Sequence, residues 1–245
     1  MIIVNIFMED KNIIVGRQHA VRRPPKYDSA TVTQETISDE LALLTLGDFE
    51  ALDFTIDLKQ FNNEISKFDN DWVDYLPRSD RLNNRKGLVL TNLPGKTHQD
   101  NPSQAQASYA AGRKVFEKEF CQPTEVFNHC TSLHPLLNTF APLGRTFLVK
   151  SNMGGYFAPH RDHPEMPRET FRIAVFLKNC KTYEYDWIIG PDTKLQIEEG
   201  RAYYINTRRT HRTISWVDNS IHLIINVPFT TKNVSKLIAS LKYGH

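Results

Sequence analysis

Cysteine is scarce in this chain. Only three of its 245 residues are cysteines, Cys121, Cys130 and Cys180, and no two of them have the CxxC spacing. A disulfide framework needs an even, patterned set of cysteines, and a zinc ribbon needs paired CxxC motifs. Both are therefore excluded, and the sequence predicts a protein of a reducing, cytoplasmic compartment.

An excess of charge of one sign is also missing. The 30 lysines and arginines nearly balance the 28 acidic residues, which leaves a formal net charge of +2. The basic residues are scattered, and the pairs Arg22-Arg23 and Arg208-Arg209 are too short to form the basic stripe that nucleic acids require. The balance of charge argues against nucleic acid as a partner.

Long apolar runs are absent as well. The apolar residues 1–8 are interrupted by Asn5, are followed by Asp10 and Lys11, and have no basic segment before them. That pattern is typical of a strand rather than of a signal peptide. A membrane-spanning helix needs about 20 apolar residues in succession, and no stretch approaches this, so we expect no membrane partner.

What is present is an ordinary globular composition, with 40% hydrophobic and 24% charged residues. We assign residues 1–45 to an N-terminal extension without a defined role, and residues 46–245 to a single domain. In the extension, residues 2–7 and 12–15 predict a hairpin, and residues 31–46 a loop with a helical turn.

The first part of the domain mixes strand and helix patterns. Apolar residues alternate over residues 51–56 and 85–93, which predicts strands. They have helical spacing over residues 58–68. Further elements expected are a loop over residues 96–104 and helices over residues 105–120, 132–140 (with Ser132 as the N-cap) and 232–241.

After Gly144 the pattern changes to many short strands. We expect strands over residues 145–151, 171–178, 183–189, 194–197, 202–206, 210–216 and 221–227, separated by turn residues such as Glu199-Gly200. This rhythm is typical of an antiparallel sandwich or barrel. The predicted fold class is therefore mainly β with added helices.

A histidine and a carboxylate stand two residues apart at His160 and Asp162. Side chains with that spacing on a strand face the same way, so both can bind one ion. His211, inside a later predicted strand, is the best candidate for a third ligand. Two imidazoles and one carboxylate form the facial triad of non-haem iron(II) oxygenases, so we predict these three residues as the metal ligands and catalytic residues.

Three segments carry a family likeness: residues 155–162 (GYFAPHRD), residues 171–177 (FRIAVFL), and residues 199–206 (EGRAYYIN), which lead to His211. They resemble the aspartyl/asparaginyl β-hydroxylase-type branch of the 2-oxoglutarate- and iron(II)-dependent oxygenases, a branch that includes free-proline hydroxylases. The resemblance implies a double-stranded β-helix, a cupin-like jelly roll, with its core at about residues 144–228. It also implies iron(II), 2-oxoglutarate as cosubstrate and O2. The implied reaction hydroxylates an unactivated C–H bond of an amino acid or of a peptide or protein side chain, with succinate and CO2 as coproducts.

The far carboxylate of 2-oxoglutarate needs a cation, preferably a guanidinium. Arg172 falls where the family carries an arginine that helps to bind the oxoacid. The family normally has another arginine on the strand after the distal histidine, and here His222 stands near that place. A histidine can donate to a carboxylate, more strongly if it is protonated. Arg172, His222 and Arg212 are the three candidates for cosubstrate binding.

Other interpretations stay open at this point. A jelly roll could bind a ligand without catalysis. A zinc hydrolase could use the same three ligands, with Glu165 as its general base. An oxygenase of this type could also act on another small molecule or on a nucleobase. The sequence does not indicate the substrate beyond a small molecule or peptide, or the oligomeric state.

Overall fold

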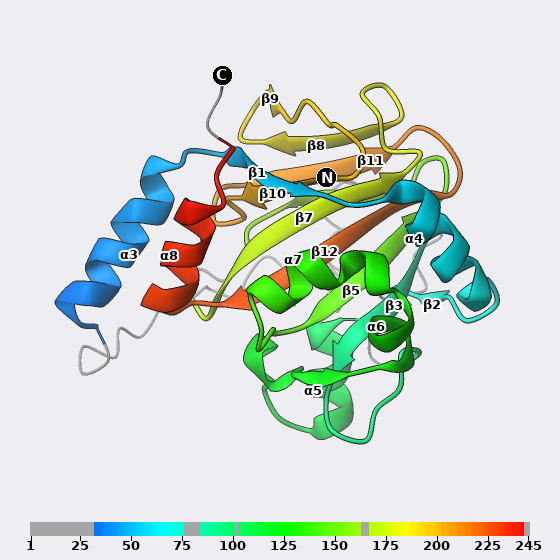
Figure 1. The fold of residues 1–245 in the computed structure, drawn as a ribbon, viewed down its shortest axis with the longest axis horizontal. Coiled ribbons are helices and arrows are strands. Elements are labelled where there is room, and N and C mark those ends of the chain that lie inside the picture. Colours follow the sequence, from blue (N-terminus) through cyan, green and yellow to red (C-terminus); the bar gives the residue numbers. More distant parts are fainter. Residues whose placement is uncertain (1–31, 76–83, 101–102, 163–166, 243–245) are drawn as a thin grey trace, which may run out of the picture.

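The computed structural model describes residues 32–75, 84–100, 103–162 and 167–242. Two antiparallel sheets dominate these residues (Figure 1). The larger sheet has eight strands in the order β1-β10-β7-β12-β5-β3-β2, with β4 paired to β3. The smaller sheet has the order β6-β11-β8-β9. The strands are β1 (Phe49–Thr55), β2 (Val73–Asp74), β3 (Arg85–Asn92), β4 (Gln122–Pro123), β5 (Thr146–Ser151), β6 (Tyr156–His160), β7 (Thr170–Lys178), β8 (Tyr185–Ile189), β9 (Thr193–Lys194), β10 (Arg201–Ile205), β11 (His211–Ser215) and β12 (Ser220–Pro228).

The last eight strands form a jelly roll. Along the chain, β5, β7, β10 and β12 join the larger sheet, whereas β6, β8, β9 and β11 build the smaller one. Two antiparallel four-stranded layers built in this way from eight successive strands are the jelly-roll arrangement. The predicted fold class is confirmed, and β1, β2, β3 and β4 extend the larger sheet.

Period-two alternation divides the buried residues of the larger sheet between two cores. On one face Leu148, Val175 and Leu223 belong to a cluster shared with the helices. On the other face Phe176 and Ile224 pack against residues of the smaller sheet such as Trp187. Side chains from both sheets therefore meet in the space between the two layers.

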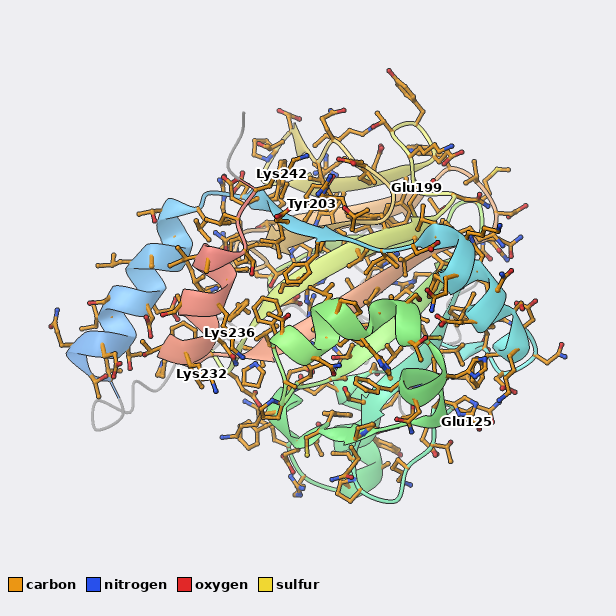
Figure 2. The ribbon with its side chains drawn as sticks, viewed as in Figure 1. Glu125, Glu199, Tyr203, Lys232, Lys236 and Lys242 are labelled. Carbon is orange, nitrogen blue, oxygen red and sulfur yellow. The ribbon has the colours of Figure 1, made fainter. Side chains whose placement is uncertain are left out.

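The described helices are α3 (Gln34–Thr45), α4 (Leu58–Ile65), α5 (Gln104–Ala111), α6 (Glu125–His129), α7 (His134–Thr139) and α8 (Thr231–Ala239), with short 3-10 turns at Ser66–Phe68, Glu117–Glu119 and Thr131–Leu133. All the named helices but α5 pack on the outer face of the larger sheet, whereas α5 belongs to a separate small cluster with Val115 and Phe120 (Figure 1). α8 lies beside α3, and Lys236 of α8 donates to the carbonyl of Thr139 at the end of α7 at 2.5 Å (Figures 1 and 2). No helix among the described residues is long and apolar enough to cross a membrane.

Three sequence expectations about helices were wrong in part. Residues 31–46 contain the full helix α3 rather than a loop, because Thr33 caps its N-terminus and Glu40 pairs with buried arginines of the domain. The helix expected over residues 105–120 ends at Ala111, since Gly112 adopts a left-handed φ of 62° that terminates it. Ser132 is no N-cap, because its hydroxyl donates to Glu64 at 2.6 Å. The hairpin expected over residues 2–15 lies outside the described residues.

Candidate metal centre

His160, Asp162 and His211 come together at one end of the smaller sheet. β6 ends at His160 and β11 begins at His211, and these two residues are direct partners in the strand pair. Their ring centroids are 4.2 Å apart. A carboxylate oxygen of Asp162 lies 3.5 Å from His160 Nε2, and the other lies 3.7 Å from His211 Nε2. One ligand atom from each residue lies within 4.8 Å of the others, a spacing that one ion can bridge.

The route by which Asp162 reaches the cluster differs from the expected one. The strand stops at His160, so alternation along a strand does not orient the carboxylate. Instead, the backbone N–H of Asp162 donates to the carbonyl of Thr207 at 2.9 Å, just before β11. The turn after β6 is thereby fixed against the segment that leads to His211.

Hydrogen bonds to backbone carbonyls determine which nitrogen of each imidazole can bind a metal. His160 Nδ1 lies 2.7 Å from the carbonyl of Ala158, and His211 Nδ1 lies 3.1 Å from the carbonyl of Arg209. A carbonyl can only accept, so each Nδ1 carries the proton. In the neutral rings each Nε2 then presents a lone pair to the cluster, as a metal-binding histidine requires.

Burial keeps His211 neutral. It lowers the pKa of this imidazole to about 4, and the charges of His160 and Arg172 act in the same direction, whereas Asp162 opposes the shift. The ring also stacks on Trp187, with centroids 5.8 Å apart and planes inclined by 11°. At neutral pH the imidazole is therefore oriented and uncharged, as a metal ligand must be.

A chain of polar contacts fixes Asp162 to the larger sheet. The guanidinium of Arg172, on β7, donates to Asp162 and to Asn226 Oδ1 on the neighbouring strand β12. The amide nitrogen of Asn226 donates to Glu117 at 3.3 Å, and Glu117 pairs with the buried Arg145 at 2.8 Å. The predicted metal-binding carboxylate thus belongs to a connected buried network rather than to an isolated ion pair.

A cavity of about 80 Å³ lies beside the three predicted ligands, between the two sheets. Its lining comprises Tyr75, Arg145, Phe147, Val149, Phe157, His160, Asp162, Arg172, Trp187, His211, Thr213, His222 and Ile224. The lining combines apolar walls with a few polar groups, as small-molecule sites do.

Two polar atoms of this lining are buried without a hydrogen-bond partner among the described residues, His222 Nδ1 and Trp187 Nε1. Buried polar atoms of a native protein are nearly always satisfied, by protein, water or ligand. His222 is also neutral, because burial and the nearby charges of Arg85 and Arg172 lower its pKa to about 3. The expectation that it could donate as a cation is therefore wrong, although the neutral ring can still offer one N–H.

The structure brings five of the six predicted site residues to one place. Arg172 and His222 line the cavity together with the three ligands, but Arg212 does not. Arg212 follows the inward-facing His211 on β11, so alternation directs it to the outer face, where it donates to the carbonyl of Pro191 at 3.1 Å. Glu165, the base of the zinc hydrolase interpretation, lies outside the described residues.

Sequence reasoning missed other residues of the cavity. Tyr75 and Arg145 line it, yet neither belongs to a recognisable motif. Arg145 immediately precedes β5, and its pKa is raised because Glu117 and Tyr75 act against the effect of burial. Only the pairing of distant strands reveals these positions, so no local signal in the sequence marks them.

No family model and no curated protein matches the chain. Among solved structures, it is similar to a prolyl hydroxylase from Trichoplax adhaerens in complex with a hypoxia inducible factor peptide fragment (8% identity, TM-score 0.44), covering 86% of this chain and 99% of that one. It is also similar to a Pseudomonas putida prolyl-4-hydroxylase (9%, TM-score 0.40), covering 78% and 99% of the two chains. A third, a 2OG-Fe(II) oxygenase family oxidoreductase from Burkholderia pseudomallei, has 10% identity and a TM-score of 0.39 over 78% and 89%. At such values none of these neighbours assigns a reaction to this chain.

Proposed function

We propose that this protein is a 2-oxoglutarate- and iron(II)-dependent dioxygenase. The observation that carries the proposal is the set of two oriented imidazoles and one carboxylate beside an open cavity. This set suits iron(II) and leaves coordination positions for other ligands. His160 Nε2, His211 Nε2 and the Asp162 carboxylate would hold the ion.

The reaction proposed is the hydroxylation of an unactivated C–H bond. One O2 and one 2-oxoglutarate are consumed, one oxygen atom enters the substrate, and succinate and CO2 leave. Bound iron supplies the activation of O2 that protein side chains cannot provide. We propose an amino acid, or a peptide or protein side chain, as the substrate. This choice of substrate rests on the sequence resemblance and on the near-neutral charge of the chain.

The protein's own residues have separate tasks in this proposal. Arg172 and Asn226 hold the Asp162 carboxylate in position, and the guanidinium of Arg172 lies at the metal end of the cavity. The unpartnered Trp187 Nε1 and His222 Nδ1 offer polar contacts to a ligand. Tyr75 and Phe157, which contact each other edge-to-face, supply aromatic walls of the cavity.

The zinc hydrolase interpretation has less support. Such an enzyme needs a general base beside its metal-bound water, in addition to the ligands. Among the described residues of the cavity lining, Asp162 is the only carboxylate, and it is engaged with Arg172. Burial also makes His222 a weak base.

A direct test uses Asp162→Ala, with Asp192→Ala in the exposed turn between β8 and β9 as a matched control. We expect the wild type and the control to bind iron(II) under anaerobic conditions, and to convert labelled 2-oxoglutarate into succinate. The Asp162 variant should lose about 100-fold or more in iron affinity, because even outer partners of metal ligands contribute 10- to 100-fold.

Unchanged iron affinity in Asp162→Ala would show that the ligand assignment is wrong. A wild type that binds iron(II) but neither binds nor turns over 2-oxoglutarate would contradict the oxygenase proposal. Metal-dependent hydrolysis with zinc would favour the hydrolase instead.

A further inference from the structure

A row of three residues crosses the larger sheet beside the cavity. Arg85 of β3 is the direct partner of Ser151 on β5, and Ser151 is the direct partner of Ser220 on β12. The next pair along these strands is Val149 and His222, both of which line the cavity. Residues two apart on a strand, and direct partners across strands, point to the same face. The side chain of Arg85 is therefore on the face of the sheet that looks into the sandwich.

The guanidinium of Arg85 lies against the cavity wall. Its central carbon is 3.4 Å from the centroid of the Phe157 ring and 5.7 Å from that of Tyr75, and both rings line the cavity. It is also close enough to His222 to help lower the pKa of that imidazole. A positive charge thus stands at the part of the cavity where His222 contributes its unpartnered Nδ1.

Two arginines line the cavity itself, and each holds a carboxylate of the protein. Arg172 donates to Asp162, so it lies at the metal end. Arg145 forms a buried ion pair with Glu117, whose two oxygens accept from its Nε and its Nη2 at 2.8 and 3.0 Å. On β12, where the family resemblance places an arginine, the residues that face the sandwich include Ser220, His222, Ile224 and Asn226, and none of them is an arginine. The two serines of the row are small, so they place no bulk between the Arg85 guanidinium and β12.

We propose that Arg85 binds the far carboxylate of 2-oxoglutarate. It would replace the arginine that the family resemblance places on β12 and that this chain lacks there. This inference rests on the proposed function and deepens it. A five-carbon dicarboxylate that reaches the metal with its oxoacid end directs its second carboxylate away from the metal. A guanidinium matches that group with a planar, two-pronged donor set. The neutral His222 adds a single N–H beside it.

The test compares two oxoacids on the metal-loaded protein. 2-Oxoglutarate and 2-oxopentanoate share a carbon chain, but the second lacks the far carboxylate. Their affinities would be measured by anaerobic titration calorimetry on the wild type, Arg85→Gln, Arg85→Lys and the control Lys86→Gln. Lys86 is the next residue of β3 and is exposed, so its variant tests the general effect of lost charge.

We expect the wild type and Lys86→Gln to prefer 2-oxoglutarate. Arg85→Gln should lose about 10- to 100-fold in affinity for 2-oxoglutarate, the range that a lost charged hydrogen bond predicts, with little change for 2-oxopentanoate. Arg85→Lys, which keeps the charge but not the fork, should fall between them. Iron affinity, measured separately, should stay unchanged in every variant.

Equal preference for 2-oxoglutarate in the wild type and in Arg85→Gln would overturn the assignment of Arg85 and leave the proposed function intact. A wild type that binds iron but neither oxoacid would overturn the proposed function, and with it this inference. An equal loss of affinity for both oxoacids in Arg85→Gln would show that the variant damages the cavity, which also contradicts a specific contact with the far carboxylate.

Discussion

At the scale of single residues, the metal centre depends on one buried amide. Asn226 accepts from Arg172 with its oxygen, and donates with its nitrogen to Glu117 and to the carbonyl of Arg145. Only a side chain with an acceptor and a donor in one plane can join two ion pairs in this way. The position of Asp162 is therefore decided partly by a residue that does not touch it.

Asn226→Ala should weaken both the fold and the metal site. Buried groups of Arg172 and Glu117 would lose a partner, at a cost of about 2 kcal/mol in the free energy of unfolding. Iron affinity should fall about 10-fold, because the support of Asp162 is loosened. Urea denaturation and anaerobic iron titration measure the two effects, with the exposed Asn63→Ala on α4 as control. An Asn226 variant with wild-type iron affinity would refute the link.

At the scale of elements, α3 is fastened to the jelly roll by charge. Glu40 is buried, and its carboxylate accepts from Arg168 at 2.6 Å and from Arg208 at 3.1 Å. Burial alone would raise the pKa of Glu40, but the hydrogen bonds and charges of these arginines outweigh it and leave the pKa below 4.5. Few apolar side chains anchor this helix, so the ion pairs account for much of its docking.

This contact predicts sensitivity to acid. A carboxyl whose pKa is lower in the folded state stabilises the fold fully above its unfolded pKa, near 4.5, and loses that contribution as the pH falls through the folded value. Glu40→Gln should cost about 3 kcal/mol near neutral pH, and should flatten the fall in stability below about pH 4.5. Urea unfolding across pH 3–7 measures this, with the exposed Glu35→Gln as control. An equally steep acid limb in Glu40→Gln would contradict it.

At the scale of the whole molecule, the candidate metal centre joins the two sheets. His160 and His211 belong to the smaller sheet, whereas Asp162 is held by Arg172 and Asn226 of the larger one. An ion bound by all three ligands would therefore resist separation of the layers. Binding to the folded state should appear as a gain in global stability.

Manganese(II), as an oxygen-stable stand-in for iron(II), provides this measurement. At 100 times its dissociation constant it should raise the free energy of unfolding of the wild type by about 2.7 kcal/mol, and a chelator should reverse the gain. Asp162→Ala should gain far less, whereas Asp192→Ala should match the wild type. Equal stabilisation of both variants would place the binding site elsewhere.

The sequence by itself determined the features that short-range patterns encode. Turn residues and alternation predicted most strands of the core, because strand geometry repeats every two residues. The expected strands lacked Tyr156–His160, however, and the strand expected over residues 194–197 is the shorter Thr193–Lys194. The HxD spacing and the later histidine singled out three residues that the structure does bring together. Alternation from His211 also predicts that Arg212 points away from the cavity.

Only the tertiary structure decided which charges meet. Residues 85, 151 and 220 lie far apart in sequence, and their alignment depends on strand register, which no local pattern specifies. The same holds for Glu40, which ends in a buried ion pair with residues 128 positions and more away. Register and long-range pairing therefore placed the cations of this cavity and the helix α3. Local patterns had already singled out the three predicted metal ligands, although the contact of Asp162 with Thr207 decides where its carboxylate lies.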